Sequence, residues 1–406
     1  MMIRNYVSTL SVLTCFVAIY GCVVLAVCPA LASSPRQITD FRGKTVQIPD
    51  RINRVVTIDD GLTEGVMTIL GESGRIVGLG SRSLRKTSRF TIPSTKGPDL
   101  VYEDCMNPVR YLNPGFADLP LVKDASGINF ETVAGLAPDV VIIRAGSCSA
   151  SFGTSGQAFE KSVEVLESLG IPVVVLKAPP CSPHPTLDDI PGEIRLIGRI
   201  FGKEDIAGRV ADEIMDRVDE IWKRTREIPA ISKPGILALG LSPKARSRGG
   251  AGNVRSGILK YYIEEVVNAK SAFTVTYHTP DTGLVSAEQV LAMDPDVIVL
   301  TTSFGYHPPE ELYNAPYYEV FGDLRAVKTR RVSALPFTPS NCDASRIEHP
   351  IDLMIIAKTA YPSRFCDIRV SEWVLEFYQS VYGVSRETAA ALRSVQLLDW
   401  TVDTGF

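Results

Sequence analysis

The chain has 406 residues, of which 45% are hydrophobic and 22% are charged, and its formal net charge at neutral pH is −4. This composition is typical of a folded globular protein and excludes a long disordered or low-complexity chain. The small negative net charge gives no electrostatic footprint for nucleic acid, so no nucleic-acid partner is expected. A chain of this length is expected to hold about two to three domains.

The amino-terminal residues differ in composition from the rest. Arg4 is followed by a mostly apolar stretch, Val7–Ala32, which ends in Ala-Leu-Ala. This ending is typical of an export cleavage site, so residues 1–32 are interpreted as a cleaved signal peptide. The stretch is long for a signal peptide, which leaves open an uncleaved membrane anchor or lipid attachment at Cys22 or Cys28. The remainder is expected to be periplasmic or at the cell surface.

The first lobe is expected over residues 38–180. In chain order its elements are a hairpin at 41–49, strand 54–58, helix 63–70, strand 75–79, a loop-rich section 81–121, a helix–strand unit at 131–143, helix 158–169 and strand 172–176. Buried β-branched strands that alternate with helices predict a parallel sheet covered on both faces.

A linker is expected over residues 185–230. Apolar side chains within it recur at three- and four-residue spacing, with charged residues between them: Ile206, Val210, Ile214, Val218 and Ile221. This periodicity predicts an amphipathic helix over residues 203–226. The helix has no strand partner of its own, so it is interpreted as a stiff connector, and packing wholly on one lobe is the alternative.

The second lobe is expected over residues 233–406. Its elements are strand 235–241, a glycine-rich loop 247–257, helix 258–268, a helix–strand unit at 288–300, and helices at 350–359 and 371–382. Ser286 and Gln289 fit a capping box at the start of the second unit.

The two helix–strand units have the same pattern at one constant offset. Glu131, Pro138 and Asp139 of the first correspond to Glu288, Pro295 and Asp296 of the second. Proline cannot continue a helix and so ends it in both copies. The duplication predicts an α/β fold of two lobes with mainly parallel sheets flanked by helices. One long α-helix would bridge the lobes, with a ligand cleft between them.

Five cysteines lie outside the leader, at Cys105, Cys148, Cys181, Cys342 and Cys366. No Cys-x-x-Cys spacing occurs, which argues against a zinc or thioredoxin-like site. In an oxidising compartment Cys148 could pair with Cys181, since each follows a strand of the first lobe, and Cys342 could pair with Cys366. Free thiols at all five positions are the alternative.

Several segments in order also resemble a known family. They are residues 40–49, 51–56, 63–71, 76–79, both Pro-Asp units, 349–362 and 376–378. Together they resemble the extracytoplasmic substrate-binding proteins of ABC transporters for ferric siderophores, haem and cobalamin, over nearly all of residues 38–383. The segment 96–120 is long for this family and is expected to reshape the cleft.

The resemblance implies permease partners. In such proteins one glutamate on the outer face of each lobe pairs with arginines of the membrane subunits. Glu64 matches the first position and Glu265 the second, with Glu264 as a neighbouring alternative. Long-range attraction and charge-assisted hydrogen bonding would guide this docking. The receptor itself is expected to be a monomer.

Ligands of open α/β sheets bind beyond the carboxyl ends of the strands. The candidate ligand-binding residues that follow strands or lie in late loops are Arg82, Arg85, Tyr102, Arg144, Arg246, Arg248, Tyr277, His278, Tyr306, His307 and Arg346. Arginine donates paired hydrogen bonds to oxygen-rich anions, while tyrosine and histidine could stack or ligate a haem iron. Only four histidines occur in the chain, so a site for a bare metal ion is not expected.

These patterns favour a receptor that captures a metal chelate for an ABC importer, and the favoured chelate is a ferric siderophore. Haem or a corrinoid is the alternative within the same fold. An exported α/β hydrolase and a non-transport sensor or adhesin are alternatives of other classes. No Gly-x-Ser-x-Gly, His-Glu-x-x-His or phosphate-binding loop supports an enzyme. No resident cofactor is expected, and the metal would arrive with the ligand.

Overall fold

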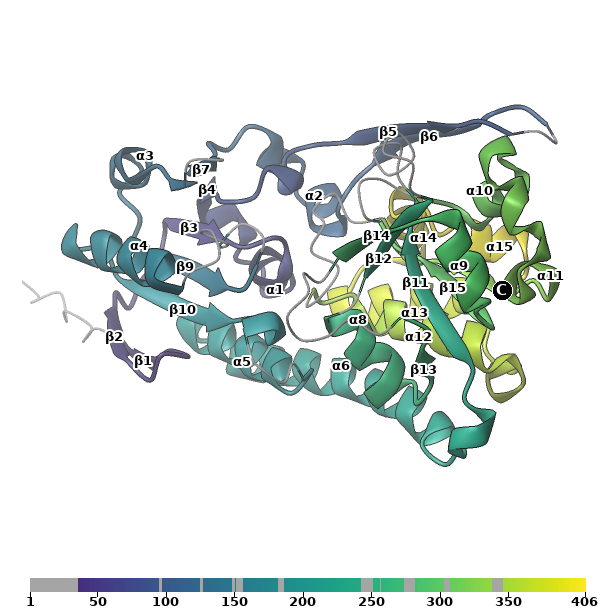
Figure 1. Ribbon diagram of the computed structural model, residues 1–406. Coiled ribbons are helices and arrows are strands. Elements are labelled where there is room, and N and C mark those ends of the chain that lie inside the picture. The colour runs from purple at the N-terminus through teal and green to yellow at the C-terminus, as the bar shows by residue number, and fades with distance from the viewer. Residues whose placement is uncertain are drawn as a thin grey trace, which may run out of the picture.

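The structure is a computed structural model of the chain. It describes residues 36–94, 97–124, 127–147, 150, 156–181, 186–241, 251–255, 257–273, 282–302, 307–337 and 346–406. Within these ranges, no helix combines the length and the apolar character needed to cross a membrane. The expected signal peptide, residues 1–32, lies outside them. Figure 1 shows two α/β lobes side by side, with long helices running along one edge of both.

The first lobe is built on a parallel sheet with the strand order β10-β9-β3-β4. Its strands are β3 (Val55–Ile58), β4 (Ile76–Leu79), β9 (Val140–Ala145) and β10 (Val173–Lys177), and its helices are α1 (Leu62–Ile69), α3 (Phe130–Gly135) and α4 (Gly156–Ser168). A hairpin of β1 (Arg36–Thr39) and β2 (Thr45–Ile48) precedes the sheet. All strands of the sheet run the same way, as predicted from their apolar sequences.

The second lobe has a sheet with a parallel centre and an antiparallel edge, in the order β14-β12-β11-β15-β16 with β13 beside β11. Its strands are β11 (Gly235–Gly240), β12 (Gly252–Arg255), β13 (Lys270–Ser271), β14 (Thr282–Val285), β15 (Val297–Leu300) and β16 (Val332–Ala334). Its helices are α8 (Ile258–Tyr261), α9 (Ala287–Met293), α10 (Pro309–Asn314), α11 (Arg325–Lys328), α12 (His349–Ala360), α13 (Val370–Tyr382), α14 (Arg386–Val395) and α15 (Trp400–Asp403).

The predicted duplication is confirmed in atomic detail. An Oδ2 atom of Asp139 accepts a hydrogen bond from the amide of Arg54 at 2.9 Å, next to β3. Asp296 accepts equivalently from the amide of Gly235 at 2.8 Å, at the start of β11. In each lobe the Pro-Asp turn therefore ties the repeat strand to the lobe's first strand. The predicted capping box at the start of α9 is also present.

Two stretches contain regular structure that was not predicted. The section 81–121 contains β5 (Ser88–Ile92), β6 (Leu100–Cys105) and α2 (Pro108–Leu112). The expected linker, residues 185–230, begins with helix α5 (Asp189–Phe201), which was not predicted from the sequence. Pro191 lies in the first turn of this helix, where a missing amide hydrogen costs no intrahelical bond. Pro191 is therefore compatible with this helix.

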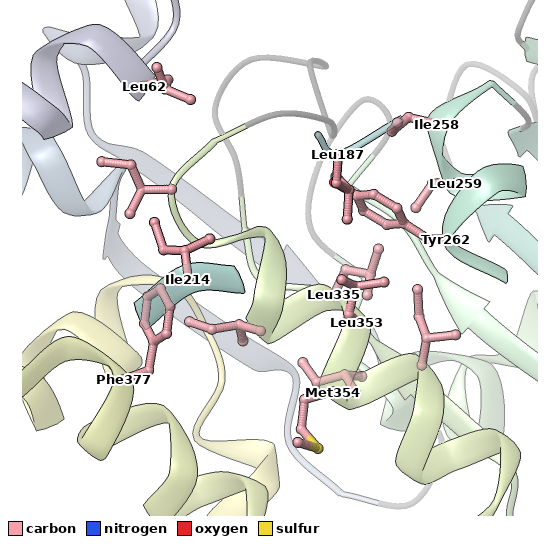
Figure 2. Packing of buried hydrophobic residues seen from close by; sticks show 14 of the residues in the cluster. Leu62, Leu187, Ile214, Ile258, Leu259, Tyr262, Leu335, Leu353, Met354 and Phe377 are labelled. Atoms are coloured by element: carbon pink, nitrogen blue, oxygen red, sulfur yellow. The ribbon is translucent and has the colours of Figure 1, made fainter. Parts of the chain in front are cut away.

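The predicted connector is helix α6 (Glu204–Thr225). It packs along α5 and also against α12 and α13 of the second lobe, so it does not lie wholly on one lobe. One apolar cluster passes through all of these helices. It includes Leu62 of α1, Ile214 of α6 and Phe377 of α13, while Leu187 packs beside Tyr262 (Figure 2). The lobes are therefore joined by a shared core as well as by the chain.

Gly65 lies where α1 meets the second lobe. A Cβ atom at this position would lie 2.7 Å from Cδ1 of Ile347 and 3.2 Å from the hydroxyl of Tyr382. We expect Gly65→Val to lower the free energy of unfolding by about 1–3 kcal/mol, through overpacking of this contact. Gly208→Val in α6 is the control, because nothing lies within 4 Å of a Cβ placed there.

Urea unfolding of both variants, followed by circular dichroism, would measure the two effects. Equal losses in the two variants would mean that only the helix propensity of valine had been measured, and that the lobe contact at Gly65 is not tightly packed.

Candidate functional site

Arg144 stands at the carboxyl end of β9, where the sequence placed a ligand-binding residue, but its guanidinium is engaged within the protein. Nε and Nη2 donate to the two carboxylate oxygens of Glu193 in α5, at 2.8 and 2.6 Å. Asp59, after β3, lies 3.8 Å from Nη1. Burial lowers the pKa of Arg144, but these carboxylates outweigh burial and hold it above its ordinary value. Arg144 is therefore a buried, charge-compensated cation.

Arg346 of the second lobe is also buried, with 7% of its surface exposed. Its Nη2 donates to Asp352 of α12 at 2.6 Å. Nε and Nη1 are buried and have no hydrogen-bond partner among the described residues. Buried N–H groups in proteins are nearly always paired, so these two donors mark a place where a ligand oxygen would be stabilised.

His349 is affected by the positive charges of both arginines. The imidazole is fully buried at the start of α12, and Nδ1 lies 2.9 Å from the backbone oxygen of Arg346. Burial, together with the positive charges of Arg346 and Arg144, lowers the pKa of His349 to about 4. The ring is therefore neutral at pH 7, Nδ1 donates, and Nε2 is left as a buried acceptor. Within the described residues Nε2 has no partner.

His349 is not among the ligand-binding residues expected from the sequence. Its signal was the pair His349-Pro350 at the start of a strongly apolar helix. A proline at the first or second helical position indicates where the helix begins. Only the packing of the first lobe against this helix start brings Arg144 close enough to affect the histidine.

A second buried histidine belongs to a different group of side chains. His307 precedes α10, and its Nδ1 lies 2.8 Å from Oε2 of Glu311. The hydroxyl of Tyr317 donates to the other oxygen of that carboxylate at 3.0 Å. Glu311 therefore orients the imidazole and leaves Nε2, which has no partner in the described part of the chain, as the remaining ring nitrogen. His307 stays a candidate ligand-binding residue.

The other predicted residues are spread more widely. Arg82 is exposed, and Arg85 donates to the backbone oxygen of Ala117 at 3.0 Å. Tyr102 lies on the β5–β6 hairpin, where burial and the nearby carboxylate of Glu310 in the second lobe raise its pKa. Arg246, Arg248, Tyr277, His278 and Tyr306 lie outside the described residues.

The first expected docking residue is not on an outer face. Glu64 is fully buried in α1. Burial and, to a smaller extent, the neighbouring Asp59 carboxylate together raise the pKa of its carboxyl to about 8. Such a group cannot present a charge to a permease, so its position contradicts the expectation. Glu265 is exposed, whereas Glu264 pairs with Lys260 at 3.7 Å.

The cysteine pairings stay predictions. Cys181 Sγ would lie 2.6 Å from a Cβ atom placed on Gly146, two residues before Cys148. Cys148 and Cys342 are outside the described residues, and Cys105, Cys181 and Cys366 have free thiols. The described residues contain no group of three or more histidine, cysteine or carboxylate side chains that could hold a metal ion.

Two lobes, a long shared helix and buried polar groups where the lobes meet are the features of a solute receptor. Residues 91–339, more than half of the chain, match the family described as Periplasmic binding protein. The chain belongs to this family. The family comprises substrate-binding proteins of transporters, which agrees with the expected class and with a non-enzymatic role.

Individual relatives of this periplasmic binding protein are distant in sequence. The molybdate-binding protein MolA of Haemophilus influenzae is 23% identical over 390 residues, covering 89% of this chain and 95% of MolA. Its molybdate-bound structure has a TM-score of 0.60 at 21% identity and covers 86% of this chain and 98% of its own.

Other solved structures show the same fold. A periplasmic solute-binding protein of Veillonella parvula has a TM-score of 0.68 at 22% identity, covering 91% of this chain and 99% of its own. CeuE of Helicobacter pylori, with Ni(II) bound, has a TM-score of 0.59 at 17% identity, covering 87% of this chain and 98% of its own. The two-lobed architecture predicted from the repeat is thus confirmed.

The buried carboxyl of Glu64 makes the stability of this binding protein depend on pH. Its pKa is raised from an ordinary 4.5 to about 8. Between these values the folded chain keeps a proton that the unfolded chain releases, so the free energy of unfolding falls as pH rises through this window. Glu64→Gln should remove this contribution.

We expect the difference in unfolding free energy between Glu64→Gln and wild type to shift in favour of the variant from pH 5 to pH 8. Urea unfolding at four pH values in this range would measure it. The difference between the two proteins isolates Glu64, because all other groups titrate in both. A constant difference would mean that Glu64 ionises normally in the folded state.

Proposed function

We propose that this protein is the extracytoplasmic receptor of an ABC importer and that it captures an anionic, oxygen-rich solute between its lobes. One observation carries the proposal. Two buried guanidiniums, Arg144 from the first lobe and Arg346 from the second, both lie close enough to His349 for their charges to lower its pKa. A solute held at this boundary would contact both lobes. Export of the chain with cleavage after Ala32 belongs to the same proposal.

The chemistry of this boundary favours oxygen ligands. Arg346 has two buried N–H donors, at Nε and Nη1, for which the described residues supply no acceptor. The neutral ring of His349 offers Nε2 as an acceptor for a protonated oxygen or a water. A guanidinium held in place by Asp352 loses little freedom when it binds an oxyanion.

Two solute classes present such oxygens. A ferric siderophore, the ligand favoured by the sequence, presents carboxylate, catecholate or hydroxamate oxygens, and haem presents propionates. A tetrahedral oxyanion is the second candidate, because MolA, a relative by 23% identity, is named for binding molybdate. In either case the metal would come with the solute and no resident cofactor is needed.

Arg346 provides the direct test. We expect one of molybdate, tungstate, a ferric siderophore, haem or cobalamin to raise the melting temperature of the purified protein, because a ligand that binds only the folded state stabilises it. Arg346→Gln should lower the affinity for that ligand by about 10- to 100-fold, because it removes a charge-assisted hydrogen bond worth about 1.5–3 kcal/mol.

Arg82→Gln is the matched control, since Arg82 is exposed. Isothermal titration calorimetry of the three proteins with the stabilising solute would measure the dissociation constants. If none of the five solutes stabilised the wild type, or if both variants bound equally well, the proposed site would be wrong.

Docking to a permease is also part of the proposal, with different glutamates from those first expected. Glu131 and Glu288 occupy matching positions of the duplicated unit, in the first turns of α3 and α9, and both are exposed. Hydrogen bonding to Ser286 lowers the pKa of Glu288, so it is ionised at pH 7. One exposed carboxylate at the same place in each lobe fits a transporter with two membrane subunits.

We expect Glu131→Arg and Glu288→Arg each to raise, by about 10-fold, the receptor concentration that half-maximally stimulates the transporter's ATPase in proteoliposomes, because like charges oppose association. Solute affinity should not change. Glu160→Arg, at an exposed position of α4, is the control, and Glu265→Arg tests the earlier candidate. If only Glu265→Arg lost stimulation, Glu265 and not the pair Glu131 and Glu288 would be the docking residue.

A further inference from the structure

The β5–β6 hairpin extends from the first lobe across to the second. Its strands run antiparallel, with Phe90 opposite Tyr102 and Thr91 opposite Val101. In Figure 1 the hairpin leaves the first lobe near α2 and runs along the edge of the molecule opposite α5 and α6, towards α10. Its second strand, β6, falls within the segment 96–120, which was expected from the sequence to reshape the cleft.

The two faces of the hairpin have different surroundings. On the inner face, the ring of Phe90 packs edge-to-face on Phe337, at the end of the second lobe's sheet, with ring centroids 5.1 Å apart. Tyr102, opposite Phe90, is half-buried beside carboxylates of α10 and α15. On the outer face Thr91 is exposed, and Val101 exposes 50% of its surface. Only one face therefore binds the second lobe.

The base of the hairpin is attached to the second lobe as well. The amide of Met106 donates to the backbone oxygen of Val395, the last residue of α14, at 3.1 Å. Cys105 is fully buried next to this bond. Helix α2, which follows the hairpin, also contacts α14. The first lobe thus holds the carboxyl-terminal helices through a backbone bond and apolar contacts.

We propose that the β5–β6 hairpin is a strap that fixes the separation of the two lobes. Helix α6 joins the lobes along one edge and the strap joins them along the opposite edge. The lobes can rotate apart about α6 only if Phe90 leaves Phe337 and the Met106–Val395 bond opens. Release of a solute into a permease would then require the strap to detach. This inference does not depend on which solute is bound.

The distance between the lobes tests the strap directly. Nitroxides carried by non-canonical amino acids at exposed positions 160 and 319 would report it by double electron–electron resonance, with the native cysteines left in place. Wild type should give one narrow distribution. Phe90→Ser with Tyr102→Ser should add a second, longer population. Thr91→Ser with Val101→Ser, on the outer face, should leave the distribution unchanged.

A narrow, unshifted distribution in the inner-face variant would overturn the proposal, provided that its circular dichroism is that of the wild type. Broadening in both variants would also overturn it, because the contact with Phe337 would then not be the cause.

Hydrogen exchange of the unmodified protein gives a measurement that needs no variant. Peptides that contain the amide of Met106 and those from α14 should exchange slowly and with the same opening rate. Exchange of Met106 as fast as that of an unstructured peptide would show that the strap is not attached in solution.

Discussion

The structure depends on one apolar core that both lobes share. Buried side chains of α1, α5, α6, α12 and α13 form a continuous cluster, so neither lobe closes its own hydrophobic surface alone. Burial of apolar area contributes roughly 25 cal/mol per Å², and separating the lobes completely would expose this surface. The boundary between the lobes is therefore a well-defined place, and polar groups can be held there in fixed positions.

Charge at this boundary is governed by the cost of burying ions. An unpaired buried guanidinium would be costly, and each arginine here is compensated by carboxylates, Arg144 by Glu193 and Arg346 by Asp352. The result differs from a simple basic pocket. Recognition would come from a few oriented N–H groups of Arg346 and one neutral imidazole, which favours ligands by the geometry of their oxygens more than by total charge.

The duplication explains the common frame of the lobes, and the hairpin breaks their symmetry. In both halves an aspartate after the helix-ending proline accepts from the amide that starts the first strand. The two copies consequently display Glu131 and Glu288 at matching exposed sites. Among the described residues the second lobe has no counterpart of the β5–β6 hairpin, which forms a two-stranded sheet of its own and contacts the second lobe through Phe90 and Met106.

Local sequence patterns were sufficient for the repeat, the long helix and the parallel strands. Their periodicity, proline positions and capping residues act over a few neighbouring residues, as at Ser286 and Pro295. Helix α5 was not predicted from the sequence, although Pro191, a helix breaker in most contexts, is harmless in its first turn.

Only the tertiary structure decided which charged residues are free to act. Glu64 looked like a surface carboxylate, but the folded protein buries it completely, next to the Asp59 carboxylate. Arg144 looked like a ligand group, but Glu193, far along the chain, takes its hydrogen bonds. The sequence by itself determined the two-lobed α/β architecture, because that follows from short-range periodicity. The partners of its buried charges depend on contacts between distant segments, and these exist only once the lobes have packed together.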